Sequence, residues 1–305
     1  MTPPPQPFDQ RTGKIWLDGD LVDWQSARLH VLTHGLHYGS GVFEGARAYQ
    51  GRIFCLPEHS ERLCESARLL DMRLPWNADA ISRACLETLR ANQLQDAYVR
   101  PIAWRGSEVM GVSAQKSRIH MAIAVWSWPS YFDPAERQAG LRLDIADWRR
   151  PAPDTAPCKS KATGLYMICT LARHQAEAKG YADALMLGWR GQVAEATGAN
   201  IFFREGNRLH TPVPDCFLDG ITRRSVMALA RKAGVELVER EIWPSELDNF
   251  EECFITGTAA EVTPVREIGP HRFQPGALGK RLMEDYSALV LAPSDYAGGV
   301  RRLAS

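Results

Sequence analysis

The sequence predicts a mixed α+β fold divided into two domains. Its 305 residues exceed one average domain and suffice for two domains of about 150 residues each. Short runs of alternating apolar and polar residues meet at two-residue glycine turns, which is typical of β-hairpins, and segments with helical spacing stand between them. Hairpins recur too often for a purely doubly wound fold, so we expect α+β rather than α/β.

The composition is that of a globular protein and excludes several classes of partner. Apolar residues make up 45% of the chain and charged residues 24%, both ordinary values. The 36 basic and 36 acidic residues cancel, so neither nucleic-acid binding by bulk charge nor charge-driven disorder is expected. No run of about 18 apolar residues is present, so we expect no membrane-spanning helix. Small molecules are the expected partners.

The N-terminus and the cysteines favour a cytoplasmic protein with reduced thiols. The first 13 residues lack the apolar core of a signal peptide, and four prolines among the first seven predict a loose tail over residues 1–13. The chain has seven cysteines, an odd number, and no two of them are separated by two residues. Neither a zinc ribbon nor a thioredoxin-type redox pair is therefore expected.

Turn and periodicity patterns locate the elements of the N-terminal half. Asp18-Gly19 and Gln50-Gly51 each lie between apolar-alternating runs and predict two hairpins. Apolar residues at helical spacing predict helices over residues 57–72 and 79–94. Strands are expected at residues 97–104, 118–126 and 141–148.

A stretch with prolines and a glycine at residues 128–139 predicts the connection between the domains. The domains are then expected at residues 1–127 and 140–305. In the second domain, Gly234 is the expected C′ residue of a helix over residues 222–234. Another helix is expected at 163–178, and strands at 183–187, across 192–212, and at 236–242, 252–257 and 261–268.

Motifs of several common cofactor and catalytic sites are absent from the sequence. The chain has no GxGxxG after a strand, no GxxxxGK[ST], no GxSxG and no HExxH. His30, His34 and His37 are spaced so that a helix would stack them on one face, but glycines interrupt the segment and argue against a regular helix. We therefore expect hydrogen-bonded histidines there and no metal site.

Two lysines precede the helix predicted at residues 163–178. A lysine in such a loop is ordinarily a solvated surface residue. The alternative is a desolvated amine that forms a Schiff base with a carbonyl ligand. Only one of Lys159 and Lys161 can be in such a site. Tyr166 follows Lys161 by five residues, a spacing that lets its phenol approach the same ligand.

Three further segments combine a polar group with small residues. Glu195 stands in an apolar run, where a carboxylate is costly unless it meets a cation such as the ring nitrogen of a bound heterocycle. Gly220-Ile221-Thr222 opens a helix whose amides and dipole would favour phosphate, although an ordinary N-cap at Thr222 explains the same residues. Gly257-Thr258-Ala259 offers either a second turn with exposed amides or simply a strand end.

Six collinear motifs are more specific than any one of these segments. They are HYGSGVFEGARAY, YVRPIAWRG, the lysine segment ending at Lys161, EATGANIF, LDGITR and ITGTAAEVTPV. In these motifs the chain closely resembles the class IV aminotransferases, the fold-type IV enzymes that depend on pyridoxal 5′-phosphate, from about Lys14 to Val290. Within that family it is most similar to branched-chain amino acid aminotransferases. The resemblance implies a D-amino acid aminotransferase-like fold, with a smaller N-terminal α/β domain and a larger C-terminal β-barrel-like domain with helices.

The resemblance implies a role for each matching residue around the cofactor. Lys161 would form the internal aldimine, Glu195 would pair with the protonated pyridine nitrogen, and Tyr166 would hydrogen-bond the phenolic oxygen. Leu218 would pack on the pyridine ring. The phosphate would be held by Arg62, Ile221, Thr222 and Thr258.

The resemblance also implies the substrate contacts. Tyr98 and the Thr258–Ala259 turn would hold the α-carboxylate. Arg100 would contact the second carboxylate of glutamate, and Arg47 would organise the same wall. The side-chain pocket would be lined by Phe43, Gly45, Trp128, Tyr131 and Tyr166.

The implied reaction is transamination between leucine, isoleucine or valine and 2-oxoglutarate, in ping-pong order. The displaced amine of Lys161 would carry the proton from the substrate Cα to the cofactor C4′. Tyr38 and the loop around Met110–Val112 would reach into the neighbouring subunit's site, so a homodimer would be the smallest working unit.

Other activities of the same fold remain alternatives. The loop RGSEVMGV departs from the best-known members, and relatives act on D-amino acids, on (R)-amines or, as lyases, on 4-amino-4-deoxychorismate. That loop has no histidine, which argues against a D-amino acid enzyme. A non-enzymatic relative is disfavoured because Lys161, Tyr166 and Glu195 are all present.

Overall fold

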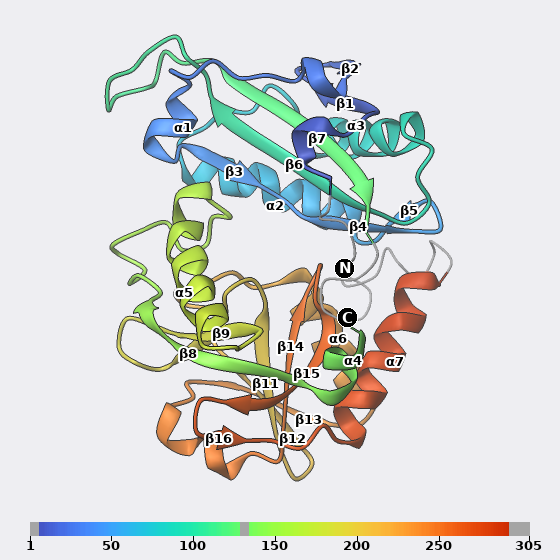
Figure 1. The fold of residues 1–305 in the computed structure, drawn as a ribbon, viewed down its shortest axis with the longest axis vertical. Helices are drawn as coiled ribbons and strands as arrows, with labels where there is room; N and C mark the ends of the chain where they lie inside the picture. The colour runs from blue at the N-terminus through green and yellow to red at the C-terminus, as the bar shows by residue number, and fades with distance from the viewer. Residues whose placement is uncertain (1–5, 129–133, 293–305) are drawn as a thin grey trace. The chain divides into compact units, whose positions relative to one another are not determined.

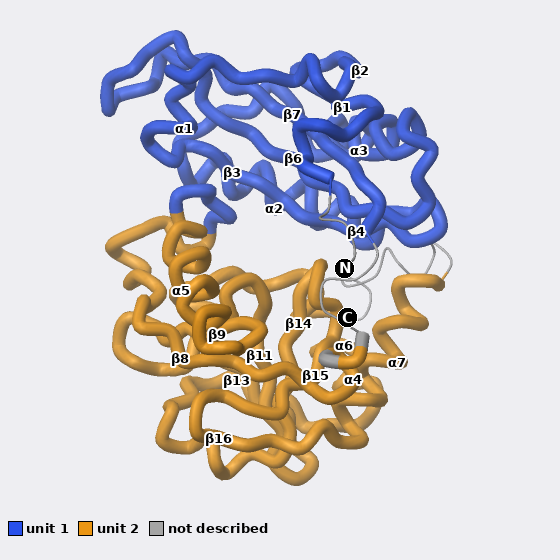
Figure 2. Tube along the Cα trace, in the orientation of Figure 1, with its two compact units in different colours: residues 1–129, 160–164 blue, residues 130–159, 165–305 orange. Residues whose placement is uncertain are grey.

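The chain forms two compact units (Figure 2). The structure is a computed structural model that describes residues 6–128 and 134–292. Unit 1 comprises residues 1–129 and 160–164, and unit 2 comprises residues 130–159 and 165–305.

A short return of the chain completes unit 1. Ala162 forms an antiparallel β-bridge with Val42, and Lys161 O accepts a hydrogen bond from Phe43 N at 3.1 Å. Unit 1 is therefore not one continuous stretch of sequence, because it includes residues 160–164 as well as the N-terminal part of the chain. The connection expected at residues 128–139 ends in helix α4 (Pro134–Ala139), while its residues 129–133 lie outside the described part of the chain.

Seven strands of unit 1 form one antiparallel sheet (Figure 1). The strand order is β2-β1-β7-β6-β4-β5, and β3 pairs with β6 beside this path. The strands are β1 (Lys14–Leu17), β2 (Asp20–Asp23), β3 (Gly41–Phe43), β4 (Ala46–Tyr49), β5 (Arg52–Ile53), β6 (Ala97–Arg105) and β7 (Ile119–Ser127).

Helices α2 (Leu56–Leu69) and α3 (Ala78–Ala91) pack on one face of this sheet and form the core of unit 1. Leu63 of α2, Ile81 of α3 and Val99 of β6 are fully buried in one apolar cluster, and burial of each such side chain contributes about 1.5–3 kcal/mol. Side chains alternate along a strand, so the neighbours of Val99 on β6 point to the opposite face. That face carries the candidate substrate residues of unit 1.

The two hairpins predicted in the N-terminal half are confirmed. Asp18 and Gly19 have φ values of 52° and 117°, and Gln50 and Gly51 have 51° and 76°. Positive φ at both central residues is what a type I′ turn requires.

Two N-terminal segments are more regular than expected. Residues His34–Tyr38 form a short helix, α1, which includes Gly35, and Gly39 ends it in the left-handed region at φ 60°. Within the tail expected to be loose, Phe8–Gln10 forms the 3₁₀ helix η1. It is held because Trp24 Nε1 donates to Phe8 O at 2.6 Å and the Phe8 ring packs edge-on against Trp126.

Nine strands of unit 2 form a sheet that curls into an open barrel. Their order is β10-β9-β8-β15-β14-β11-β12-β13, with β16 paired to β15. The edge strand β10 comes back to the opposite edge, because Val193 N donates to Ile242 O, just beyond β13, at 2.8 Å. The strands are β8 (Leu141–Arg149), β9 (Asp183–Leu187), β10 (Val193–Ala196), β11 (Asn200–Glu205), β12 (Arg208–Pro212), β13 (Glu236–Arg240), β14 (Glu252–Gly257), β15 (Glu261–Ile268) and β16 (His271–Arg272).

The main helices of unit 2 are α5 (Met167–Ala178), α6 (Ile221–Lys232) and α7 (Ala277–Leu291). Short 3₁₀ turns are η2 (Trp24–Ser26) in unit 1, η3 (Thr163–Tyr166) and η4 (Pro244–Asn249). Helix α6 has Gly220 as its N-cap residue, so the interpretation of Thr222 as an ordinary N-cap is wrong. Gly234 follows its end at φ 76°, as predicted. No helix in the described ranges is long and apolar enough to cross a membrane.

Candidate active site

Lys161 and Lys159 have different environments. Lys159 is exposed, whereas Lys161 is half-buried and its Nζ lies 5.0 Å from the ring centroid of Phe43. Helix α2 holds the lysine segment through Ser66: Lys161 N donates to Ser66 Oγ at 3.0 Å, and Ser160 Oγ donates to Ser66 O at 2.9 Å. The backbone of Lys161 is therefore fixed at both its N–H and its carbonyl.

Arg62, the phosphate ligand expected in unit 1, is held by a buried carboxylate. Arg62 Nε donates to Glu44 Oε1 at 2.7 Å and Nη2 to Oε2 at 3.0 Å, and His59 Nδ1 lies 2.7 Å from the same Oε2. Burial alone would raise the pKa of Glu44, but the charge of Arg62 and the hydrogen bond from His59 outweigh it and lower the pKa. Burial also lowers the pKa of His59, and Glu44 only partly offsets that effect.

Arg100 is surrounded by aromatic rings on the open face of the sheet. Its guanidinium carbon lies 4.8 Å from the ring centroid of Phe43, 5.1 Å from Tyr98 and 6.0 Å from Trp126. Its Nε is buried without a hydrogen-bond partner, and within the described ranges no carboxylate pairs with this guanidinium. Trp128 extends the aromatic group, with its ring 4.9 Å from that of Tyr98. A half-buried cation that has no carboxylate partner among the described residues suits an anionic substrate group.

Two further expected pocket residues adjoin Tyr98. A Cβ at Gly45 would lie 1.9 Å from Tyr98 Oη, so only glycine fits there. Arg47 faces Tyr98 across the β4–β6 pair, and its guanidinium carbon lies 4.8 Å from the Tyr49 ring centroid. Tyr131, also expected in the pocket, lies outside the described residues.

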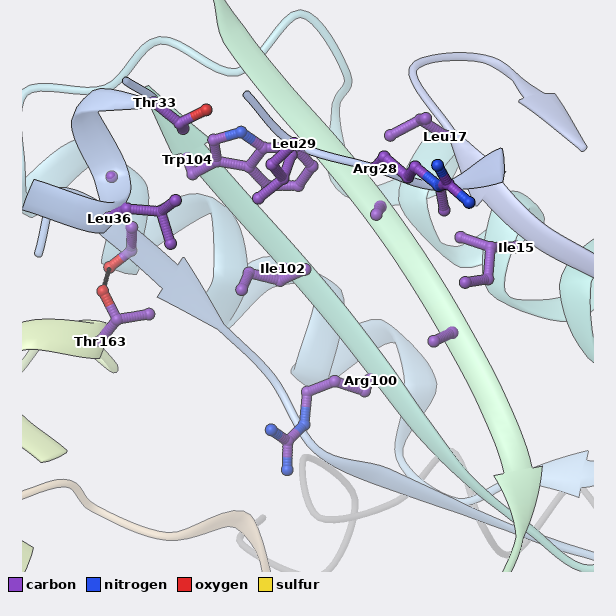
Figure 3. A pocket seen from close by; sticks show the side chains of 15 residues that line it. Ile15, Leu17, Arg28, Leu29, Thr33, Leu36, Arg100, Ile102, Trp104 and Thr163 are labelled. Carbon is purple, nitrogen blue, oxygen red and sulfur yellow. Dashed lines mark hydrogen bonds between the residues drawn. The ribbon is translucent and has the colours of Figure 1, made fainter. Parts of the chain in front are cut away.

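An apolar cavity of about 350 Å³ continues along the same sheet face (Figure 3). Leu29, Leu36 and Trp104 gather at one end of it, and Arg100 lies toward another. Thr163 reaches its wall and donates from Oγ1 to Gly41 O at 3.2 Å. Unit 1 thus presents an apolar surface with the half-buried cation of Arg100 beside it.

Tyr38 and Val112, expected to serve the neighbouring subunit, are exposed on unit 1. Their relative exposures are 48% and 85%. Tyr38 Oη donates to Met110 O at 3.2 Å, and the Tyr38 ring stacks on buried His34 at 4.5 Å. His34 Nε2 also lies 3.0 Å from Gly111 O, so α1 and this loop are tied together.

The three N-terminal histidines make hydrogen bonds, as expected. His34 Nδ1 lies 2.6 Å from Ser40 Oγ, His30 Nδ1 accepts from Leu32 N at 3.1 Å, and His37 Nε2 lies 2.8 Å from Val31 O. In the part of the chain that the structure describes, no group of three or more His, Cys, Asp or Glu side chains is arranged to hold a metal ion.

In unit 2, Glu195 on β10 has a cationic partner within the protein. Arg150 Nε lies 3.5 Å from Glu195 Oε1, and Arg150 is only 3% exposed. The same guanidinium bonds to Cys169 Sγ at 3.4 Å and to Cys216 O at 3.4 Å. Burial alone would lower the pKa of Arg150, but the charge of Glu195 raises it, so the guanidinium stays protonated beside Glu195. Arg150 thus satisfies the need for a cation that the isolated acid implied.

Asn200 joins two of the expected cofactor residues, Glu195 and Leu218, to the N-cap of α6. Its Nδ2 donates to Glu195 Oε2 at 3.3 Å and to Leu218 O at 2.9 Å, and its Oδ1 accepts from Gly220 N at 3.1 Å. A Cβ at Gly220 would lie 2.1 Å from that Oδ1, so the N-cap position requires glycine. One side chain therefore sets the spacing between the acid and the start of α6.

The start of α6 is suited to an anion. The helix has no side-chain cap, and no described group accepts a hydrogen bond from the N–H groups of Ile221 and Thr222. Free first-turn amides and the helix dipole favour negative charge there.

The other residues of unit 2 expected to contact cofactor or substrate are half-buried, in a turn or just before a helix. Thr258 and Ala259 are half-buried in the tight turn between β14 and β15, which is closed by the Gly257–Glu261 pair. Tyr166 is half-buried just before α5 and packs in the cluster that contains Cys169.

Residues 41–268 match the family model described as Amino-transferase class IV. The chain belongs to the class IV aminotransferases. It is 41% identical over 287 residues to the branched-chain-amino-acid aminotransferase of Pseudomonas aeruginosa, covering 92% of this chain and 94% of that one. It is 33% identical over 284 residues to the enzyme of that name from Escherichia coli K12, covering 90% and 92%.

Solved structures of such enzymes have the same fold as this aminotransferase. The T.th. branched-chain amino acid aminotransferase with pyridoxamine 5′-phosphate has a TM-score of 0.90 and 35% identity, covering 94% of this chain and 97% of that one. The enzyme of Thermoproteus uzoniensis with norvaline has a TM-score of 0.88 and 36% identity, covering 96% and 98%. The predicted two-domain, fold-type IV α+β class is confirmed, as is the prediction of an enzyme.

Several residues that shape this site were not singled out from the sequence. Glu44 and His59 support Arg62, Ser66 supports the lysine segment, and Arg150 and Asn200 support Glu195. Glu44 had a detectable signal, because it is an acid in an apolar stretch, as Glu195 is. The others are ordinary helix, strand or motif residues, and the partners of Ser66 and Arg150 lie 95 and 45 positions away along the chain.

Proposed function

We propose that this class IV aminotransferase uses pyridoxal 5′-phosphate to transfer the amino group of leucine, isoleucine or valine to 2-oxoglutarate. The observation that carries the proposal is the grouping around Asn200. One side chain contacts the acid Glu195, the backbone of Leu218 and the start of α6, which has no side-chain cap. These three features would recognise, in that order, a protonated pyridine nitrogen, the face of its ring and a phosphate. The branched-chain enzymes named above support the substrate class.

The residues of each unit fit the cofactor chemically. In unit 2, Glu195 pairs with Arg150, and the uncapped amides of Ile221 and Thr222 would hold an anion. Leu218, Thr258 and Tyr166 would complete that set. In unit 1, the half-buried amine of Lys161 would be the attachment point, and Arg62 would hold the phosphate.

The bound cofactor supplies an electron sink that stabilises negative charge at the substrate Cα. Glu195 would hold a proton at the pyridine nitrogen, and Tyr166 would donate a hydrogen bond to the phenolic oxygen. Lys161 Nζ would accept the proton from Cα and deliver it to the cofactor carbon C4′. The fixed backbone of Lys161 limits where its amine can reach.

The substrate residues would serve both halves of a ping-pong reaction. Tyr98 and the Thr258–Ala259 turn would hold the α-carboxylate, and the aromatic wall with Gly45 would receive an aliphatic chain. Arg100, with Arg47 organising the same wall, would receive the side-chain carboxylate of glutamate. The T.th. enzyme has been solved both with N-(5′-phosphopyridoxyl)-L-glutamate and with 4-methylvaleric acid, which supports one pocket for both kinds of substrate.

The working unit would be at least a homodimer in the cytoplasm. Exposed Tyr38 and Val112 would then contact the substrate bound by the neighbouring subunit. The tie between α1 and the Met110–Val112 loop supports this role, because it presents both side chains together.

One pair of assays tests the proposed function. Product formation is measured for leucine, isoleucine, valine, D-alanine, an (R)-amine and 4-amino-4-deoxychorismate, each with and without 2-oxoglutarate. We expect turnover of the three branched-chain L-amino acids that depends strictly on 2-oxoglutarate. Pyruvate release without an acceptor would instead show a lyase, and preference for the D-amino acid or the amine would overturn the substrate class.

A further inference from the structure

Glu44 is the most completely buried acid of unit 1, and it lies beside the segment that carries Lys161. Its relative exposure is 0%, and its backbone is fixed because Glu44 N donates to Pro101 O at 2.8 Å. The preceding residue, Phe43, donates to Lys161 O. Nothing in the proposed reaction requires an acid at this place, and an acid near a phosphate site is repulsive in itself.

Three N–H donors point at this carboxylate from one face of helix α2. Arg62 Nε and Nη2 form a two-point contact with its two oxygens, and His59 Nδ1 lies 2.7 Å from Oε2. A two-point contact fixes both the position and the plane of a guanidinium, which a single contact does not. A guanidinium has five N–H donors, and this contact uses two of them.

His59 completes the coordination of the carboxylate without adding charge. It is 3% exposed, and burial lowers its pKa, so its ring is neutral near pH 7. A neutral ring that faces a carboxylate through Nδ1 carries its proton on that nitrogen. His59 therefore donates a hydrogen bond to Glu44 Oε2, and the positive charge of the group stays on Arg62.

We propose that Glu44, fixed by His59, is a positioning residue that aims the guanidinium of Arg62 at the phosphate of the cofactor. The inference rests on the proposed function, in which Arg62 holds that phosphate. Helix α2 then sets two distances at once, because Arg62 is followed one turn later by Ser66, which holds the backbone of Lys161. The phosphate ligand and the attachment lysine are positioned by the same helix.

The substitution Glu44→Gln separates orientation from charge. A glutamine offers one acceptor and one donor group, so its amide would face at least one of the three N–H donors with a donor. Loss of orientation predicts weaker phosphate binding, whereas simple removal of a negative charge predicts stronger binding. The direction of the change therefore decides between the two.

The experiment measures dissociation constants of pyridoxal 5′-phosphate and of pyridoxal, which lacks the phosphate, for the full-length enzyme after removal of its cofactor. We expect Glu44→Gln to raise the constant for pyridoxal 5′-phosphate about 10- to 100-fold and the constant for pyridoxal less than about threefold. His59→Gln should show a smaller change of the same selectivity. Glu44→Gln combined with Arg62→Ala should be no weaker than Arg62→Ala alone.

Glu252→Gln is the matched control. Glu252 is also buried, at 3%, pairs with Arg204 and accepts from Gly279 N, but it lies in unit 2 among residues with no expected cofactor role. It should lower thermal stability without phosphate selectivity. If Glu44→Gln does not fold, His59→Gln and Glu44→Asp carry the same comparison.

Three outcomes overturn the inference: equal losses for both ligands, tighter binding of pyridoxal 5′-phosphate, or additive losses in the double variant. The proposed function fails separately. If Arg62→Ala itself leaves binding of pyridoxal 5′-phosphate unchanged, the assignment of Arg62 to the phosphate is wrong, whatever Glu44→Gln shows.

Discussion

Arg150 Nε lies 3.5 Å from Glu195 Oε1, and both side chains are shielded from solvent. A buried acid whose partner is removed is left as an uncompensated charge, which typically costs about 3–5 kcal/mol. Arg150→Met should therefore lower the stability of the enzyme by about that amount, while Arg150→Lys should retain part of it. Urea unfolding of the two variants checks this, and equal stability of the wild type and Arg150→Met would show that the pair contributes little.

Glu195 should control the electronics of the cofactor more than its affinity. Glu195→Gln keeps the shape of the side chain and the contact with Asn200 but removes the charge that would hold a proton on the pyridine nitrogen. We expect the single-turnover rate of Cα proton removal to fall roughly 100-fold, by analogy with other lost electrostatic contacts in active sites. The dissociation constant of the cofactor should change much less. Near-normal single-turnover rates would exclude this role.

Lys161, and not Lys159, should carry the cofactor. Lys161 is half-buried and its backbone is fixed by Ser66 and Phe43, whereas Lys159 is exposed. Lys161→Ala should abolish covalent attachment and turnover, and Lys159→Ala should keep most of the activity. Reduction with borohydride followed by peptide mapping identifies the modified lysine, and a pyridoxyl group on Lys159 would contradict the assignment.

Local patterns in the sequence predicted the local structure well. The glycine turns at Asp18-Gly19 and Gln50-Gly51 demand positive φ, and both hairpins form. The N-cap of α6 was misplaced by two residues, at Thr222 instead of Gly220, because a threonine near a helix start is a common N-cap. In α1, glycine propensity argued against a helix that its surroundings nevertheless stabilise.

Contacts between distant residues were not predictable in the same way. The Arg150–Glu195 pair spans 45 positions, and the bridge between Val42 and Ala162 spans 120. Periodicity reports the conformation of a segment, not which segments meet, so these partners become visible only in the fold. The motifs of the family predicted the candidate residues, and the structure adds what holds them in place.

The buried cysteines should be unreactive in the native enzyme despite the nearby Arg150. Burial raises the pKa of Cys169 to about 11 and that of Cys216 to about 12, although the charge of Arg150 lowers both. A thiol pKa of about 11 instead of the usual 9.0 reduces the thiolate fraction about 100-fold at neutral pH. Iodoacetamide at pH 8 should therefore label the half-buried Cys64 first. Rapid labelling of Cys169 before unfolding would contradict this.

The Glu44 group should make the enzyme sensitive to acid. The pKa of Glu44 is lower in the folded protein than its usual value of 4.5, so its contribution to stability is present above about pH 5 and is lost as the pH falls toward the folded value. One such group changes the free energy of unfolding by at most about 1.4 kcal/mol per pH unit. Between pH 5 and 3 the stability of Glu44→Gln should therefore fall less steeply than that of the wild type, as measured by urea unfolding. Parallel slopes would show that Glu44 titrates normally.

Arg100 should serve the dicarboxylate half-reaction selectively. Its guanidinium lies among the rings of Phe43, Tyr98 and Trp126, and within the described ranges it has no carboxylate partner. Glutamate offers a side-chain carboxylate to this cation and leucine does not. Arg100→Met keeps a long apolar side chain against the rings, so it removes the charge with little loss of packing. We expect kcat/KM for glutamate and 2-oxoglutarate to fall roughly 10- to 150-fold, which corresponds to about 1.5–3 kcal/mol of activation free energy. The value of kcat/KM for leucine should change little.

The measurement for Arg100 is single-turnover spectroscopy of each half-reaction, with thermal unfolding as the control for folding. If Arg100 only stabilises the sheet, both half-reactions should fall together or the unfolding temperature should fall first. Arg105 provides a matched variant, because it lies on the same strand but donates to Leu70 O and Asp71 O instead of facing the aromatic rings. Arg105→Met should therefore affect stability without preference between substrates. Equal losses for leucine and glutamate in Arg100→Met would leave dual specificity to another residue, and Arg47 would be the next to test because it faces Tyr98 across the β4–β6 pair.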